Sequence, residues 1–223
     1  SEYSVIFSCC HIINRLFDAN FKDSSMKLVE CVPNLSVGND DQVIQKIVNS
    51  ITAIKGVTLL DVDSGVDTNR SVVTFVGDPH AVEEAAFQSI RTASLSIDMS
   101  KHKGTHPRMG ATDVCPLIPI SNITMEECVE LSKSLGKRVG DELDIPIFLY
   151  EMSSAKPSRS NLSVIRSGEY EGLSKKLSDP KWKPDYGPST FNKKSGATVI
   201  GARNFLIAYN INLNSKDKRI ATD

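Results

Sequence analysis

Two histidines lie close together in the stretch from Asp98 to Asp113, among three cations and two glycines. Histidine has an ordinary pKa of about 6.5, so it can give and take protons near neutrality. Pro107 disfavours helical backbone at His106, and Gly104 and Gly110 allow the chain to turn closely on either side. These residue types predict an active-site loop that presents an imidazole. The alternative is a structural histidine in an ordinary loop, which is the commoner case for a lone histidine.

The elements before this loop alternate between strand and helix patterns. A short apolar run from Lys27 ends at Pro33, and an N-cap signal at 39–41 precedes apolar residues at helical spacing over 43–54. Residues 57–62 and 71–76 have strand patterns joined by a polar connection, which predicts a hairpin with a long loop. A second helix is expected to open at Asp78-Pro79. This order predicts an α+β, ferredoxin-like fold of βαββαβ type, a mixed sheet covered by helices.

The elements after the loop continue the alternation. Residues 114–120 are predicted as a strand, with Pro116 indicating an edge or a bulge. A capping-box spacing at Thr124 opens the clearest helix, over 124–141, and 146–150 is the next strand. Short helical segments follow near 162–165 and 170–177. Residues 179–196, rich in Pro, Gly, Ser and Lys, are predicted to be a loop or linker, and 197–200 and 205–213 to be two strands.

Composition limits the class of protein. The 223 residues carry 26 basic and 27 acidic side chains, so no basic excess favours nucleic acid, and no apolar run reaches the length of a membrane span. The five cysteines lack the spacing of structural zinc sites and indicate reduced, intracellular thiols, with Cys31, Cys115 and Cys128 expected in the core. We give little weight to metal binding at Cys9, Cys10 and His11.

Three blocks of the sequence resemble one known family. The sequence KHKGTHPRMGATDVCP, residues 101–116, resembles the active-site segment of the formiminotransferase domain found in formiminotransferase-cyclodeaminases and glutamate formimidoyltransferases. Lys27 to Ser36 resembles that domain's opening strand. Leu60 to Asp63, followed by Thr68 to Arg70, resembles its second. The likeness is collinear from about Met26 to about Asn214.

The resemblance implies a domain division. Residues 1–25 would be an extension of unknown role, 26–178 the N-terminal subdomain, 179–196 a linker with a folate-binding segment, and 197–223 the start of a truncated C-terminal subdomain. Unless the apolar strands at 197–213 pack on the first subdomain, they would leave an exposed edge, and we expect the chain to self-associate or aggregate through them.

The family's reaction moves a formimino group from N-formimino-L-glutamate to tetrahydrofolate, which acts as a co-substrate, and its catalytic histidine falls on His106. One histidine can take a proton from the attacking folate nitrogen and give one to the departing amine, a role typically worth about 100- to 10,000-fold in rate. Asp63 is the second expected catalytic residue, orienting His106 or stabilising a cationic intermediate. Its alternative is a turn-forming aspartate. A nucleophilic Cys115 is disfavoured, because nothing electropositive flanks it in its own strand.

The resemblance also places a folate-binding segment in the predicted linker. A ring-stacking aromatic, hydroxyls and two lysines suit a pteridine ring and a glutamate tail. The segment comprises Gly187, Pro188, Ser189, Thr190, Phe191, Asn192, Lys193, Lys194, Ser195 and Gly196. Lys103 and Arg108 are further candidates for attracting substrate carboxylates, or else solvated charges. His102 could be a second proton carrier, but a solvated surface role is the favoured interpretation. Thr105 and Val37 replace acids that are usual in the family.

These inferences lead to one expected function and one alternative. The first is a cytoplasmic glutamate formimidoyltransferase of histidine degradation and one-carbon metabolism. It would act on small molecules without a metal, nucleic acid or membrane, and as a homo-oligomer. The alternative is a truncated or non-catalytic module that binds folate or a partner.

Overall fold

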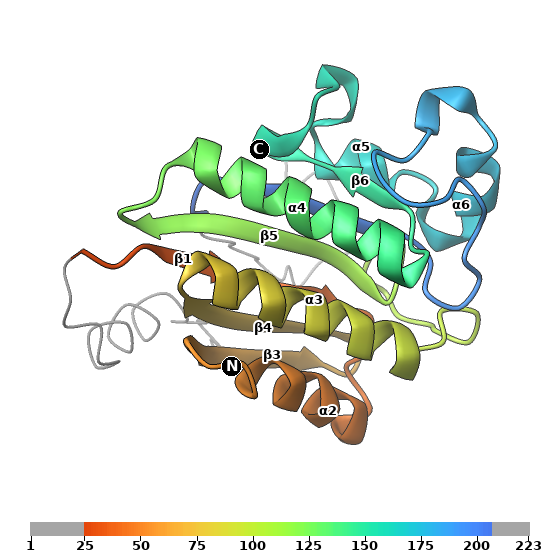
Figure 1. Ribbon diagram of the computed structural model, residues 1–223. Coiled ribbons are helices and arrows are strands. Elements are labelled where there is room, and N and C mark those ends of the chain that lie inside the picture. The colour runs from red at the N-terminus through yellow and green to blue at the C-terminus, as the bar shows by residue number, and fades with distance from the viewer. Residues whose placement is uncertain (1–24, 207–223) are drawn as a thin grey trace, which may run out of the picture.

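The computed structural model describes residues 25–206, and Figure 1 shows their arrangement. The strands are β1 (Leu28–Cys31), β2 (Asn34–Leu35), β3 (Val57–Gly65), β4 (Arg70–Gly77), β5 (Thr112–Ser121), β6 (Ile147–Leu149) and β7 (Thr198–Ala202). The α-helices are α2 (Asp41–Thr52), α3 (Pro79–Ser96), α4 (Met125–Leu143), α5 (Leu162–Arg166) and α6 (Glu169–Leu177). Short 3₁₀ helices cover η1 (Glu151–Ser153), η2 (Pro157–Arg159) and η3 (Pro180–Trp182).

The first five strands have the ferredoxin-like arrangement that the sequence predicts. β1 and β2 together act as one strand, interrupted at Pro33, and pair antiparallel with β4 on one side and β5 on the other. The hairpin of β3 and β4 turns over residues 66–69, which is longer than a two-residue turn. The α+β, ferredoxin-like prediction is therefore confirmed.

Two further strands extend the sheet beyond β5. β7 lies between β5 and β6 and runs parallel to both, giving seven strands in the described part of the chain. All five residues of β7 are buried. Residues 198–202 therefore pack on the first sheet, which is the alternative left open by the sequence, and the exposed edge expected there does not occur because this strand is covered on both sides. The predicted strand at 205–213 lies almost wholly outside the described residues, as does the extension at 1–25.

Pro116 does not mark an edge, contrary to the sequence expectation. β5 is central, with β1 and β2 on one side and β7 on the other. The carbonyl of Pro116 accepts a hydrogen bond from the Val32 N–H at 3.3 Å, at the interruption between β1 and β2. Pro116 cannot return a bond to Val32, but the Val32 carbonyl accepts instead from the Asn34 side-chain amide at 2.9 Å. The central strand therefore tolerates the proline without leaving this acceptor unpaired.

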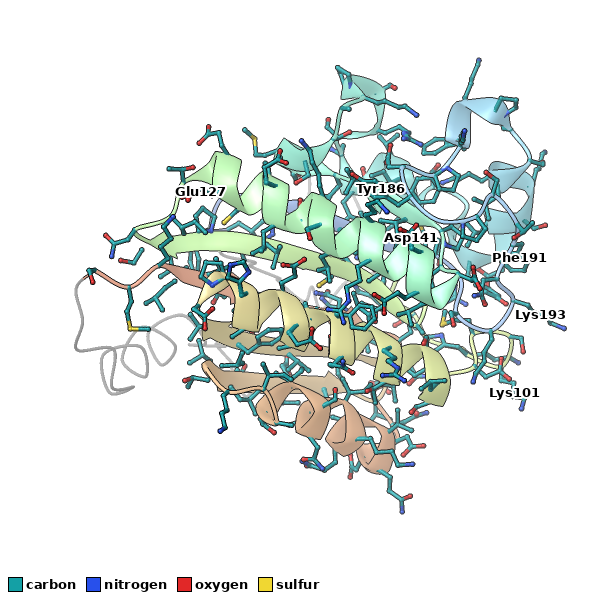
Figure 2. The ribbon with its side chains drawn as sticks, in the orientation of Figure 1. Lys101, Glu127, Asp141, Tyr186, Phe191 and Lys193 are labelled. Atoms are coloured by element: carbon teal, nitrogen blue, oxygen red, sulfur yellow. The ribbon has the colours of Figure 1, made fainter. Side chains whose placement is uncertain are left out.

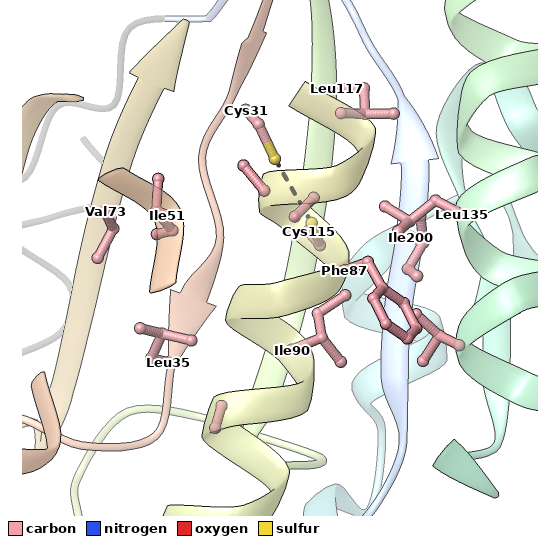
Figure 3. Packing of buried hydrophobic residues seen from close by; sticks show 14 of the residues in the cluster. Cys31, Leu35, Ile51, Val73, Phe87, Ile90, Cys115, Leu117, Leu135 and Ile200 are labelled. Atoms are coloured by element: carbon pink, nitrogen blue, oxygen red, sulfur yellow. Dashed lines mark hydrogen bonds between the residues drawn. The ribbon is translucent and has the colours of Figure 1, made fainter. Parts of the chain in front are cut away.

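Three helices cover one face of the sheet, α2, α3 and α4 lying side by side in front of it (Figure 1). Their starts follow the predicted caps: the side chains of Asp40 and Asp78 accept N–H bonds, and Thr124 forms a capping box with Glu127. Between helices and sheet lies the main core, and Figure 3 shows some of its buried side chains. Cys31 and Cys115 touch there with their sulfur atoms 3.5 Å apart.

The short helices α5 and α6 pack apolar side chains against part of the sheet's opposite face, in a second cluster that includes Ile165, Leu173 and Val199. None of the helices over 25–206 combines the length and apolarity that crossing a membrane requires. The end of the sheet where β3 finishes and β4, β5 and β7 begin carries the His106 loop.

Candidate active site

The His106 loop connects α3 to β5 and is held at both of its ends by the segment before β7. The Met99 N–H donates to the Lys194 carbonyl at 2.9 Å, and the Ala111 N–H donates to the Ser195 carbonyl at 2.9 Å. Gly110 and Gly196 form an isolated bridge. Two stretches almost a hundred residues apart are thus joined through backbone bonds, and Lys101 and Lys193 lie on the same side of the molecule in Figure 2.

Gly196 has a conformation that permits this close contact. Its φ is +69°, and a Cβ atom added to it would lie 2.1 Å from the Met109 carbonyl oxygen. An L-residue is disfavoured at this φ, and the contact leaves no room for a side chain. Glycine at this position therefore sets how closely the two stretches approach.

A small cleft holds His106. Three chain segments line it: Asn34 to Ser36 at the end of β2, Thr68 to Arg70 at the start of β4, and loop residues that include His102, Arg108 and Asp113. The cleft lies at the end of the sheet where these strands meet. The imidazole of His106 is half-buried in the cleft wall.

Nearby charges and burial act together on His106. Burial is the largest cause that lowers its pKa below the usual 6.5, followed by the positive charges of Arg70 and Arg166. A hydrogen bond with the Pro107 backbone and the negative charge of Asp113 act in the opposite direction but do not cancel the effect. The imidazole is therefore neutral at neutral pH, which is the form that accepts a proton.

Asp113 and Arg166 form a buried pair beside the loop. Asp113 is 3% exposed, and its carboxylate accepts from the Met109 N–H at 2.8 Å and from a guanidinium nitrogen of Arg166. Arg166 belongs to α5, more than fifty residues further along the chain. No local motif predicts this pairing, because Arg166 lies in a short helical segment far from Asp113 in the chain.

Arg108 does not present a free cation to a substrate. Its guanidinium donates to Glu171 at 2.8 and 2.7 Å and to Glu169 at 3.1 Å, and the bond with Glu171 is the largest cause that raises its pKa. The charge of Arg108 is thus used to fasten the loop to α6. Lys103 is exposed, so its expected attraction for carboxylates remains a prediction.

His102 belongs to the same fastening rather than to the solvated surface. Its Nδ1 accepts from the Arg108 Nε at 3.2 Å, and its Nε2 lies 2.9 Å from the Asn69 carbonyl oxygen. Because Nδ1 accepts, Nε2 carries the hydrogen that it donates to Asn69. His102 therefore ties the loop to the β3–β4 turn.

Asp63 lies within β3, opposite Val72, and its side chain is exposed. It is not in the turn, which covers 66–69, so the turn-forming alternative does not describe it. Its charge acts on the pKa of Arg70, whereas the groups that act on His106 are Arg70, Arg166 and Asp113. Arg70 is thus the charged group common to both expected catalytic residues.

The segment from Gly187 to Gly196 is an irregular loop anchored by polar bonds. The Asn192 side chain donates to the Asp144 carbonyl and accepts from the Ser195 N–H, and the Lys194 ammonium donates to the Leu95 carbonyl at the end of α3. The predicted loop is confirmed. It does not line the cleft of His106.

Tyr170 of α6 connects this segment with the loop. Its N–H donates to the Arg108 carbonyl at 2.9 Å, its hydroxyl donates to the Lys193 carbonyl at 2.6 Å, and its ring lies 5.3 Å from that of Phe191. Phe191 is half-buried and Lys193 is exposed at this surface (Figure 2). The Phe191 ring and the Lys193 side chain thus both lie at the surface of the anchored loop.

The two family departures have structural roles. The Thr105 hydroxyl donates to the Asp67 carbonyl at 3.3 Å, which adds another bond between the loop and the β3–β4 turn. Val37 is buried in the main core, where an apolar side chain packs without a charge to desolvate. Neither residue contacts His106 through a described hydrogen bond.

Cysteine chemistry finds no support at this site. Cys31, Cys115 and Cys128 are free and buried, which confirms their expected place in the core, and Cys115 is 0% exposed. A nucleophile must reach its substrate, so Cys115 is excluded from that role. Over residues 25–206 no cluster of potential metal ligands occurs, and Cys9, Cys10 and His11 lie outside that range.

Comparison with known proteins supports the family that the sequence of the His106 loop resembles. Residues 28–203 match the model of the formiminotransferase domain, N-terminal subdomain. The chain is 56% identical over 187 residues to the formimidoyltransferase-cyclodeaminase of Mus musculus, covering 84% of this chain and 35% of that protein. It is 51% identical over 195 residues to the glutamate formimidoyltransferase of Streptococcus pyogenes, covering 87% of this chain and 65% of that protein. The chain thus spans about a third of the first relative and just under two thirds of the second.

Proposed function

Because this chain belongs to the formiminotransferase family, through its N-terminal subdomain, we propose that it supplies the catalytic histidine of a glutamate formimidoyltransferase. The enzyme would move a formimino group from N-formimino-L-glutamate to tetrahydrofolate. The observation that carries this proposal is His106, half-buried in a cleft and kept neutral by burial and two arginines. The names of the two relatives support the same reaction class.

In the proposed reaction a nitrogen of tetrahydrofolate attacks the formimino carbon and forms a new C–N bond. His106 accepts the proton that leaves the attacking nitrogen. The bond between the formimino carbon and the glutamate nitrogen then breaks, and His106 returns its proton to that nitrogen as glutamate departs. A lowered pKa favours the first step, because it keeps the imidazole unprotonated. It also favours the second step, because it makes the imidazolium a stronger acid.

Asp63 would act at a distance in this scheme. Its carboxylate influences Arg70, which in turn influences His106. We propose that Asp63 balances part of the arginine charge while a cationic intermediate forms.

The folate co-substrate would use the segment from Gly187 to Gly196. The half-buried ring of Phe191, supported by Tyr170, offers a flat apolar surface, and Lys193 has no described side-chain partner within residues 25–206. Lys193 is therefore the better of the two lysines to meet a glutamate tail, since Lys194 is bonded to Leu95. The backbone bonds around Ser195 would hold the segment at a fixed distance from the loop.

Three broader features belong to the same proposal. The second subdomain would begin after the matched region, which ends at residue 203, rather than at 197. The free, buried cysteines of the described residues agree with a reducing, cytoplasmic setting. Homo-oligomer formation would have to use surfaces other than the buried strand β7.

Replacing His106 with Gln tests the proposal, with His80→Gln as the matched control, since His80 is an exposed histidine on α3. We expect His106→Gln to lose about 100- to 10,000-fold in formimino transfer, while tetrahydrofolate affinity stays within a few fold. His80→Gln should leave both unchanged. A near-normal rate in His106→Gln would refute the role. Folate binding without any turnover in the unsubstituted protein would favour the alternative of a non-catalytic folate-binding module.

A further inference from the structure

The positive charges of Arg70 and Arg166, near His106, are only partly neutralised by anionic side chains. Arg70 begins β4 and lines the cleft. Its Nε donates to the side-chain oxygen of Asn34 at 3.0 Å, and a second guanidinium nitrogen donates to the same atom. Asn34 is neutral, so these bonds position the guanidinium without neutralising it. Asp63 acts on it only weakly, as the last of the causes that affect its pKa.

Arg166 of α5 lies beside the His106 loop and lines a neighbouring hollow with Pro107 and Ser163. Its positive charge nevertheless acts on both Arg70 and His106. One of its terminal nitrogens donates to Asp113. Its Nε is buried and has no hydrogen-bond partner among the residues that the structure describes. A buried donor left unpaired is unfavourable by roughly 1–3 kcal/mol, so native structures rarely retain one unless another group satisfies it.

The charges around His106 do not balance. Arg70 and Arg166 are close enough for each to act on His106 and for Arg166 to lower the pKa of Arg70. Among residues 25–206, Asp113 is the only buried carboxylate that acts on all three. Arg108, in the same loop, shows the contrast, because it has two carboxylate partners. Two neighbouring guanidinium groups with one buried anion favour a second anion between them.

We propose that Arg70 and Arg166 bind a carboxylate of the small amino-acid donor, a glutamate derivative, and hold it beside His106. The planar guanidinium matches the two oxygens of a carboxylate. The inference deepens the proposed function, on which it rests, by naming the groups that position the donor. We assign the carboxylate to the donor rather than to folate, because the segment with Phe191 and Lys193 lines neither the cleft of His106 nor the hollow that Arg166 lines.

The test measures binding without turnover. L-Glutamate, the released product, is titrated into the intact protein while the imidazole signals of His106 are followed by NMR across a range of pH. We expect glutamate to raise the pKa of His106, because it brings negative charge beside the ring. Arg70→Gln should weaken glutamate binding about ten- to a hundredfold. Arg91→Gln, which removes an exposed arginine from α3, should leave it unchanged.

Arg166 needs a second variant, because Arg166→Gln alone leaves the buried Asp113 without its ion-pair partner. The double variant Arg166→Gln, Asp113→Asn removes both charges and preserves polar side chains of similar size. We expect the double variant to fold, as judged by circular dichroism, and to bind glutamate about ten- to a hundredfold more weakly.

Three outcomes decide the question. Unchanged glutamate affinity in both folded variants would overturn the proposal. Loss of tetrahydrofolate binding with unchanged glutamate binding would also overturn it, since the carboxylate would then belong to the folate tail. Arginine-dependent glutamate binding in a protein that transfers no formimino group would support this subsite while refuting the proposed function, so the two failures are distinguishable.

Discussion

Replacing Gly196 with Ala should damage both stability and the His106 loop, and Gly168→Ala provides a matched control. Both glycines have positive φ, +69° and +83°. An alanine in that region is strained by about 1–2 kcal/mol at either position. At Gly168 the nearest atom to an added Cβ is the Gly172 Cα at 3.6 Å, an ordinary contact. Gly168→Ala therefore measures the backbone strain alone.

The added Cβ at Gly196 would lie 2.1 Å from the Met109 oxygen and 2.7 Å from the Gly110 Cα. A normal C···O contact is about 3.3 Å, so the two backbones must separate by about 1 Å. Overpacking of this kind typically adds about 1–3 kcal/mol, for a total of about 2–5 kcal/mol. If His106 is catalytic as proposed, a shift of that size beside it should also reduce turnover by about a hundredfold.

Urea unfolding followed by tryptophan fluorescence measures the first effect, and formimino transfer measures the second. We expect Gly196→Ala to be at least about 1 kcal/mol less stable than Gly168→Ala and to be the only one of the two with greatly reduced turnover. Equal losses of stability in the two variants would show that the contact between Gly196 and the loop is not tight, and would refute the reasoning.

Three further predictions address the site. Because burial and arginine charge lower the pKa of His106, the acid limb of the rate against pH should lie below about 6.5, and Arg70→Gln should move it to higher pH by removing a positive charge; an unmoved limb would contradict the assignment to His106. Arg108→Met should reduce the free energy of unfolding by about 1–2 kcal/mol in urea titrations, since it loses charge-assisted bonds to half-solvated carboxylates. Lys137→Met, which breaks only a surface ion pair, should change stability little, and an equal effect would count against a fastening role for Arg108. Asp63→Asn should lower the turnover number less than His106→Gln does, and unchanged kinetics would remove Asp63 from the mechanism.

Local signals predicted much of the fold. Asp78 followed by Pro79 and the capping box at Thr124 are complete within four residues of sequence, so the helix starts could be located from the chain alone. The ferredoxin-like order follows from the alternation of strand-like and helix-like hydrophobic patterns along the chain. The place of β7 could not be predicted in this way, because a short apolar strand carries no mark of the partner that it will pair with.

Candidate site residues can be proposed from sequence only where residue type and neighbouring sequence carry the information. His106 has a distinctive chemistry and a turn-forming context, so it could be named from sequence. The ion pair of Arg166 with Asp113 and the bonds of Arg108 to Glu169 and Glu171 could not be predicted from sequence. They form only because α5 and α6 fold back beside the loop. The sequence suggested Arg108 as a substrate cation, whereas the structure gives it two carboxylates of its own.

The position of β7 determines the order in which this sheet can be completed during protein synthesis. β7 is the last of the described strands along the chain, yet it pairs between β5 and β6. A nascent chain that has exposed β1 to β6 therefore has no ladder to join β6 to the rest, and one side of β5 remains open. Open strand edges invite pairing with other chains, and long-range parallel pairing is slow. The half-made sheet is therefore vulnerable to aggregation until residues 198–202 have left the ribosome and closed the gap.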